Sequence, residues 1–165
     1  MKAKKAILII LAVVVLLAVG VFSVSIATGN FFFTTKYYPT ALQAYNAEPP
    51  SVAGHRDVEA ASEVGLVSLD AETALFIGAL DENRFSVSEM EVKNGQYAAK
   101  GTVFFYDLRQ DADGAERNQT HAADGDVEWA VQYSREEADR MADGATIHSF
   151  TYLNGEEILV VVYTN

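Results

Sequence analysis

The sequence contains no cysteine among its 165 residues. This absence excludes disulfide bonds, thiolate metal ligands, a cysteine nucleophile and a lipid-modified N-terminal cysteine. A folded domain in this chain must therefore be held together by buried apolar surface. The composition, which is 50% hydrophobic, makes such a core feasible.

Basic residues are scarce, with 12 Lys and Arg against 23 Asp and Glu. Every acidic residue follows Ala27, whereas Lys2, Lys4 and Lys5 precede it. The part after Ala27 thus has nine basic and 23 acidic residues, a formal charge of −14. Such a field repels phosphate backbones, so we expect no nucleic-acid partner.

The local motifs of common enzymes are also missing: there is no G-x-S-x-G, S-x-x-K, H-E-x-x-H, P-loop or G-x-G-x-x-G. Glu89 and Glu91 are spaced to lie on one face of a strand, but a single Trp gives no indication of a sugar-binding cleft. We therefore predict that the protein is not an enzyme. The alternative is an enzyme whose site is assembled only in three dimensions.

Residues 6–27 form a run of 22 positions without a charge. A helix of this length spans about 33 Å, enough to cross a hydrocarbon core of about 30 Å. The three preceding lysines place the N-terminus in the cytoplasm by the positive-inside rule. We predict a cytoplasmic tail at 1–5, a transmembrane signal-anchor at 6–27 that contacts the lipid bilayer, and an extracytoplasmic domain at the cell membrane.

Ser25 and Ala27 are small residues at the positions that a signal peptidase prefers, which leaves open a secreted protein cleaved after Ala27. The apolar stretch from Ala6 to Phe22 is longer than the usual core of about 7–15 residues in a signal peptide, and this length favours the anchor.

Five aromatic residues follow the apolar run within a short distance. Amphipathic rings favour the head-group layer, so this group predicts a membrane-interface belt, although Tyr37 and Tyr38 also suit packing into the domain itself. The five residues are Phe31, Phe32, Phe33, Tyr37 and Tyr38.

The exported part divides into a juxtamembrane segment at 28–62 and a domain at 63–165. The first contains a short helix at 39–47 and a polar connector. The second combines apolar runs with turn residues, which predicts an α+β fold: one curled antiparallel sheet of six or seven strands with two short helices. The expected strands are 64–69, 73–80, 84–92, 96–107, 127–133, 145–153 and 157–164.

Several local patterns make this fold specific. Asn94-Gly95 and Asn154-Gly155 predict two-residue type I′ hairpins. In S-R-E-E, Ser134 and Glu137 predict a capping box at the start of the second helix, which Gly144 ends.

Two strand patterns bear on burial. In RFSVSEMEV the apolar positions change parity across Ser88 and Glu89, which predicts a β-bulge that keeps Phe85, Val87, Met90 and Val92 on one face. The run 157–164 is apolar at both parities, which predicts a strand covered on both faces.

The acidic segment 108–128 contains the oxygen ligands that calcium prefers. An EF-hand alignment fails, because Arg109 falls at its first ligand position and Thr120 at its twelfth. A looser calcium site and a solvated loop both remain open. The candidate ligands are Asp111, Asp113, Asp124 and Asp126.

These patterns together predict a membrane-anchored extracytoplasmic domain that acts by non-covalent binding. It would be an accessory subunit that contacts other membrane or envelope proteins, or a binding module. The alternative is a secreted protein that binds a small ligand or calcium.

Overall fold

The computed structural model describes residues 35–47, 61–109 and 117–163. They belong almost entirely to one compact unit, Tyr37–Asn165. Its elements in chain order are α2 (Ala41–Ala47), β1 (Ser62–Ser68), β2 (Thr73–Ala79), β3 (Arg84–Lys93), β4 (Gln96–Asp107), β5 (Asn118–Ala122), β6 (Gly125–Gln132), α3 (Arg135–Met141), β7 (Ala145–Thr151) and β8 (Glu157–Tyr163).

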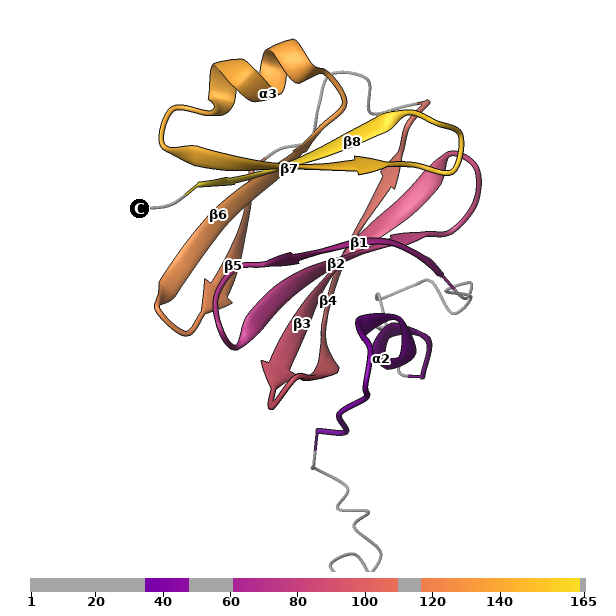
Figure 1. The fold of residues 1–165 in the computed structure, drawn as a ribbon, viewed down its shortest axis with the longest axis vertical. Coiled ribbons are helices and arrows are strands. Elements are labelled where there is room, and N and C mark those ends of the chain that lie inside the picture. Colours follow the sequence, from indigo (N-terminus) through magenta and orange to yellow (C-terminus); the bar gives the residue numbers. More distant parts are fainter. Residues whose placement is uncertain (1–34, 48–60, 110–116, 164–165) are drawn as a thin grey trace, which may run out of the picture. The chain divides into compact units, whose positions relative to one another are not determined.

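The strands form two four-stranded antiparallel sheets (Figure 1). One has the order β1-β2-β3-β4 and the other the order β5-β6-β8-β7. The prediction of antiparallel strands with two short helices is confirmed, but that of a single curled sheet is wrong. Strands such as β2 and β8 are apolar at both parities, so each sheet has two faces to bury and a second layer is required.

The main core lies between the two sheets. Phe85 and Val87 of β3 pack there against Trp129 of β6 and Val160 of β8. The outer face of each sheet is covered by one helix: Tyr45 of α2 packs with a cluster on the first sheet. Helix α3 covers the second sheet in the same way. The domain is thus a four-layer α/β/β/α sandwich.

The last strand shows why this layering is needed. In β8, Ile158, Val160 and Val162 face the inter-sheet core, while Leu159 and Val161 pack under α3. The strand lies between β6 and β7, so the prediction of a strand covered on both faces is confirmed.

The predicted bulge in β3 is wrong. Its pairing with β2 is regular from Ala79↔Phe85 to Thr73↔Glu91, so β3 keeps its alternation and the two apolar pairs face opposite sides. Phe85 and Val87 face the other sheet, whereas Met90 packs in the cluster under α2. The irregularity is in β4, whose extra residues lie between the partners of Ser88 and Met90.

Strand β5 was not predicted, because NQTHA reads as part of a polar loop. The strand pairs with β6 from Asn118↔Trp129 to Ala122↔Gly125. Only its alternation identifies it: Thr120 and Ala122 are buried, while the residues on either side of Thr120 are exposed. A short edge strand needs no more apolar surface than this.

The two Asn-Gly turns differ. Asn94 and Gly95 have φ values of 53° and 74°, as a type I′ turn requires, so that prediction is confirmed. At the second site the predicted type I′ turn is wrong, because only Gly155 has a positive φ, 88°. Its N–H donates to Tyr152 O at 2.9 Å, and the loop is the three-residue form that ends in a glycine bulge.

Both helices form where the sequence predicted them, with different caps. Helix α2 begins at Ala41, and the N–H of Gln43 donates to Thr40 Oγ1 at 3.2 Å. Ser134 is the N-cap residue of α3, but its side chain makes no capping hydrogen bond, so the predicted capping box is not formed.

Within residues 35–47, 61–109 and 117–163, no helix is long and apolar enough to cross a membrane. The predicted span at 6–27 lies outside these residues, and so does most of the connector.

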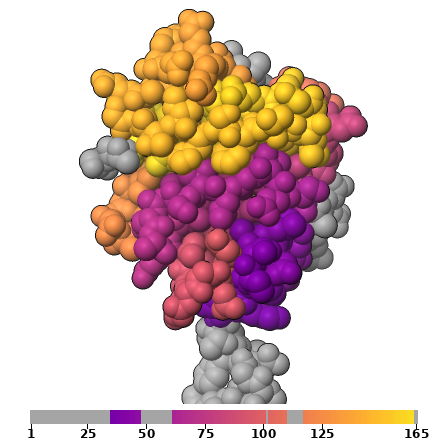
Figure 2. All heavy atoms as spheres, viewed as in Figure 1, coloured from indigo at the N-terminus to yellow at the C-terminus, as the bar shows by residue number. Residues whose placement is uncertain are grey.

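Strands β1 and β7, which belong to different sheets, contact each other at one side of the sandwich. Figure 2 shows the C-terminal strands lying directly against β1 on this face. The contact depends on Gly65, because a Cβ atom there would lie 2.1 Å from Cε1 of Phe150. The missing side chain makes room for the ring.

We expect Gly65→Val to destabilise the domain by about 1–3 kcal/mol, since the new side chain must displace the Phe150 ring. Chemical denaturation would measure this loss. Ser68→Val, which places the same side chain at an exposed position of β1, is the matched control. If the clash is the cause, Gly65→Val will cost less in a Phe150→Ala background; an equal cost in both backgrounds would contradict it.

Candidate functional site

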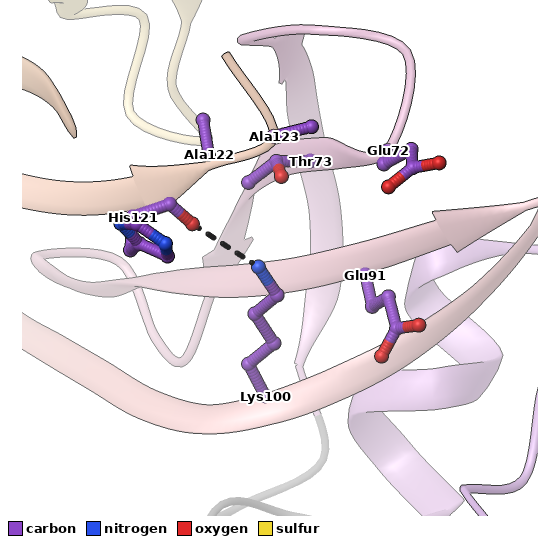
Figure 3. Close-up of a pocket in the computed structure, with 7 residues that line it drawn as sticks. All are labelled: Glu72, Thr73, Glu91, Lys100, His121, Ala122 and Ala123. Carbon is purple, nitrogen blue, oxygen red and sulfur yellow. Dashed lines mark hydrogen bonds between the residues drawn. The ribbon is translucent and has the colours of Figure 1, made fainter. Parts of the chain in front are cut away.

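The two sheets leave an open pocket of about 330 Å³ at one end (Figure 3). The β1–β2 turn, the β5–β6 turn and the neighbouring parts of β3 and β4 surround it. We call it the mouth pocket, and its lining residues are Glu72, Thr73, Glu91, Lys100, His121, Ala122 and Ala123.

Charges of opposite sign lie apart from each other in the mouth pocket. Figure 3 shows the Lys100 ammonium beside His121, and the carboxylates of Glu72 and Glu91 away from it, pointing in different directions with a strand between them. The Lys100 ammonium donates to His121 O at 3.3 Å. The His121 ring is 87% exposed, and its Nδ1 lies 2.8 Å from Asp126 Oδ1. The pocket can therefore contact a cationic and an anionic group at once.

Glu91 is held in place by Tyr37, whose hydroxyl donates to Glu91 Oε1. This hydrogen bond to the carboxylate raises the pKa of Tyr37, with further contributions from burial and from the negative charge of Glu91. The Lys93 ammonium lies 5.8 Å from the centre of the Tyr37 ring. One aromatic residue thus links two charged side chains at the edge of the pocket.

The two turns that border the mouth pocket are joined by Asp70. Its carboxylate accepts the N–H of Glu72 at 2.8 Å and the N–H of Ala123 at 2.6 Å. Burial by itself would raise the pKa of Asp70, but these donors and Thr73 outweigh it and lower that pKa. Asp70 therefore connects the first sheet to the second through its charged form.

Deeper between the sheets, Glu89 is 8% exposed and accepts the Thr120 hydroxyl at 2.7 Å. Thr120 Oγ1 in turn accepts the Trp129 Nε1–H at 2.8 Å. We call these three residues the buried Glu89 network. Because a buried polar group is costly without partners, the network fixes the first sheet against β5 and β6.

A second polar contact joins the sheets at the far end of β3. The Tyr152 hydroxyl donates toward the carbonyl oxygens of Asp81 and Arg84, the latter at 2.5 Å. Burial, assisted by the negative charge of Asp81, raises the pKa of Tyr152 to about 12. The hydroxyl thus stays protonated and serves as a donor throughout the physiological range.

Of the predicted calcium ligands, Asp124 and Asp126 lie at the β5–β6 hairpin, and both are exposed. Asp126 contacts His121 and also accepts the Gln119 side-chain amide at 3.1 Å. Asp111 and Asp113 lie outside the described residues. Within the described part of the chain no three acidic or His side chains are grouped to hold a metal, and the calcium site stays a prediction.

Of the predicted interface aromatics, Phe31, Phe32 and Phe33 lie outside the described residues. Tyr38 forms an isolated bridge with Tyr97 of β4 and packs beside the α2 cluster. Tyr37 contacts Glu91, as described above.

The comparisons with known proteins give no further indication: no family model, curated protein or solved structure matches the chain.

Sequence reasoning placed Glu89 and Glu91 on one strand face, and the pairing Leu75↔Glu89 and Thr73↔Glu91 confirms this. It did not select Glu72 or Lys100. The signal that could have found Lys100 is a charged residue inside the predicted strand 96–107.

We expect Thr120→Val to destabilise the domain by about 2–4 kcal/mol, because it leaves both Glu89 and Trp129 buried without this partner. Thr120→Ser keeps the hydroxyl and is the control. Urea denaturation would measure both variants. If the Val and Ser variants were equally stable, the buried Glu89 network would not contribute this free energy.

Asp70 also predicts a dependence of stability on pH. Its folded-state pKa lies below the ordinary value of 3.8, so its contribution is present above pH 3.8 and is lost as the pH falls through the folded-state pKa. The stability difference between the wild type and Asp70→Asn should therefore shrink on acidification. Urea denaturation over a pH series measures this, with the exposed Asp124→Asn as control; a constant difference would contradict the linkage.

Proposed function

We propose that the protein is a single-pass, membrane-anchored extracytoplasmic domain that acts by non-covalent binding. The observation that carries this proposal is the uncharged run at 6–27, preceded by Lys2, Lys4 and Lys5. In this arrangement the N-terminus would be cytoplasmic and the sandwich would lie on the other side of the membrane.

The position of the folded unit in the sequence supports an anchored domain. The unit begins at Tyr37, so only residues 28–36 separate it from the proposed span. A segment of this length reaches at most about 30 Å, which would keep the sandwich close to the membrane surface. Such a domain suits an accessory subunit that contacts other membrane or envelope proteins.

The build of the domain supports a binding role. Its interior is a packed inter-sheet core, and its mouth pocket presents charged groups of both signs at the end of that core. The formal charge of −14 after Ala27 favours partners with basic surfaces. A packed core with a charged surface pocket suits a domain that binds a partner molecule.

A second candidate is a secreted ligand-binding protein, freed by cleavage after Ala27. The small residues Ser25 and Ala27 favour it. The two candidates differ in whether the mature chain keeps residues 6–27.

We expect the full-length chain to stay in the membrane pellet after carbonate extraction. A variant with Val14→Lys and Leu17→Lys should move to the soluble fraction, since each lysine near the centre of a span costs about 2.5–3.5 kcal/mol. Ala3→Lys adds a lysine outside the run and should stay in the pellet. If the intact mass of the wild-type protein corresponds to a chain that begins at Thr28, the anchor proposal is wrong and cleavage is established.

The accessory-subunit role has a separate test. Extraction in mild detergent, followed by affinity purification of the full chain, should recover one or more membrane or envelope proteins in constant proportion. Recovery of the protein alone from every preparation would contradict this role.

A further inference from the structure

We propose that the mouth pocket binds a small zwitterion of the α-amino acid type, whose ammonium faces Glu72 and whose carboxylate faces Lys100. This inference rests on the proposed binding role and names the class of ligand. It follows from the arrangement of charge, from the frame that holds it and from the charge of the whole domain.

The first argument is the separation of charge. The Glu72 carboxylate lies apart from the Lys100 ammonium, which is beside His121 (Figure 3). A ligand with one charge of each sign can contact both groups together. A bare cation would meet the Lys100 ammonium, and a bare anion would meet the Glu72 carboxylate, so each would be repelled by part of the lining.

The second argument is preorganisation. Asp70 joins the two turns that border the pocket through the N–H groups of Glu72 and Ala123. Thr73 and Ala122 are 1% and 3% exposed, so the base of the pocket is part of the packed domain. A site whose frame is already ordered loses less entropy when a small ligand binds.

The third argument concerns the net field. The chain after Ala27 carries a formal charge of −14, which disfavours the approach of anions from solution. A zwitterion has no net charge and is not repelled at long range. Lys100 can then contact the ligand carboxylate at short range.

The size of the pocket limits the ligand. A volume of about 330 Å³ is at the lower end of the range for small-molecule sites. The pocket is also open to solvent, so its charged contacts are partly screened and we expect dissociation constants on the order of millimolar.

The test is an NMR titration of the full chain in detergent micelles, followed at the amides of His121 and Ala123. The probes are glycine, L-alanine and L-serine, with methylammonium and acetate as the two halves of glycine. We expect saturable shifts with at least one amino acid and binding about tenfold weaker for each half.

Variants locate the site. Lys100→Gln and Glu72→Gln should each weaken binding of that amino acid about tenfold, since each removes one charged contact. Glu136→Gln on α3, outside the lining, is the matched control and should bind as the wild type does. Absence of saturable shifts with all three amino acids, or unchanged affinity in both lining variants, would overturn the proposal.

The outcome is separable from that of the proposed function. Amino acid binding by a chain that purifies alone would support the pocket assignment and contradict the accessory-subunit role. If a membrane protein copurifies in constant proportion but no amino acid binds, the pocket assignment is contradicted and the accessory-subunit role is supported.

Discussion

The burial of apolar side chains between two sheets is the constraint on which the rest of the domain depends. Without disulfides, the free energy of folding comes mainly from this inter-sheet layer, where Trp129, Phe85 and Val160 are fully buried. The same burial makes every enclosed polar group costly unless it is paired. Glu89 is therefore bonded to Thr120 across the two sheets, and Thr120 to Trp129 within the second sheet. The apolar core and the buried polar residues are therefore packed together in the same inter-sheet layer.

The inward face of β3 shows how this arrangement leads to the mouth pocket. Phe85 and Val87 lie in the core, Glu89 follows in the buried network, and Glu91 lines the pocket. One strand face thus runs from apolar core to charged surface within a few residues. Glu91 is positioned by the same pleat that buries Phe85, so the geometry of the pocket depends directly on the packing of the core.

Some features were readable from short stretches of sequence. The turn at Asn94 and Gly95 requires positive φ at two adjacent residues, and few other residues tolerate that. The apolar positions of β3 do change parity along the strand, but the predicted bulge is wrong. The pattern alone does not say that both faces of the sheet are covered. Strand β5 was missed for a similar reason: its polar composition resembles a loop until β6 is placed beside it.

The sequence by itself determined the acidic charge, the absence of disulfides, most strands and both helices, and the uncharged run at 6–27 that motivates the anchor proposal. These depend on composition or on neighbours a few residues apart. Only the tertiary structure decided which faces meet: Asp70 bonds Ala123 across 53 positions, and Thr120 bonds Glu89 across 31. No local sequence pattern predicts such contacts, because they form only when two sheets, each with its own pattern, pack face to face. The mouth pocket is lined by residues of both sheets, and for that reason no single stretch of the sequence predicts it.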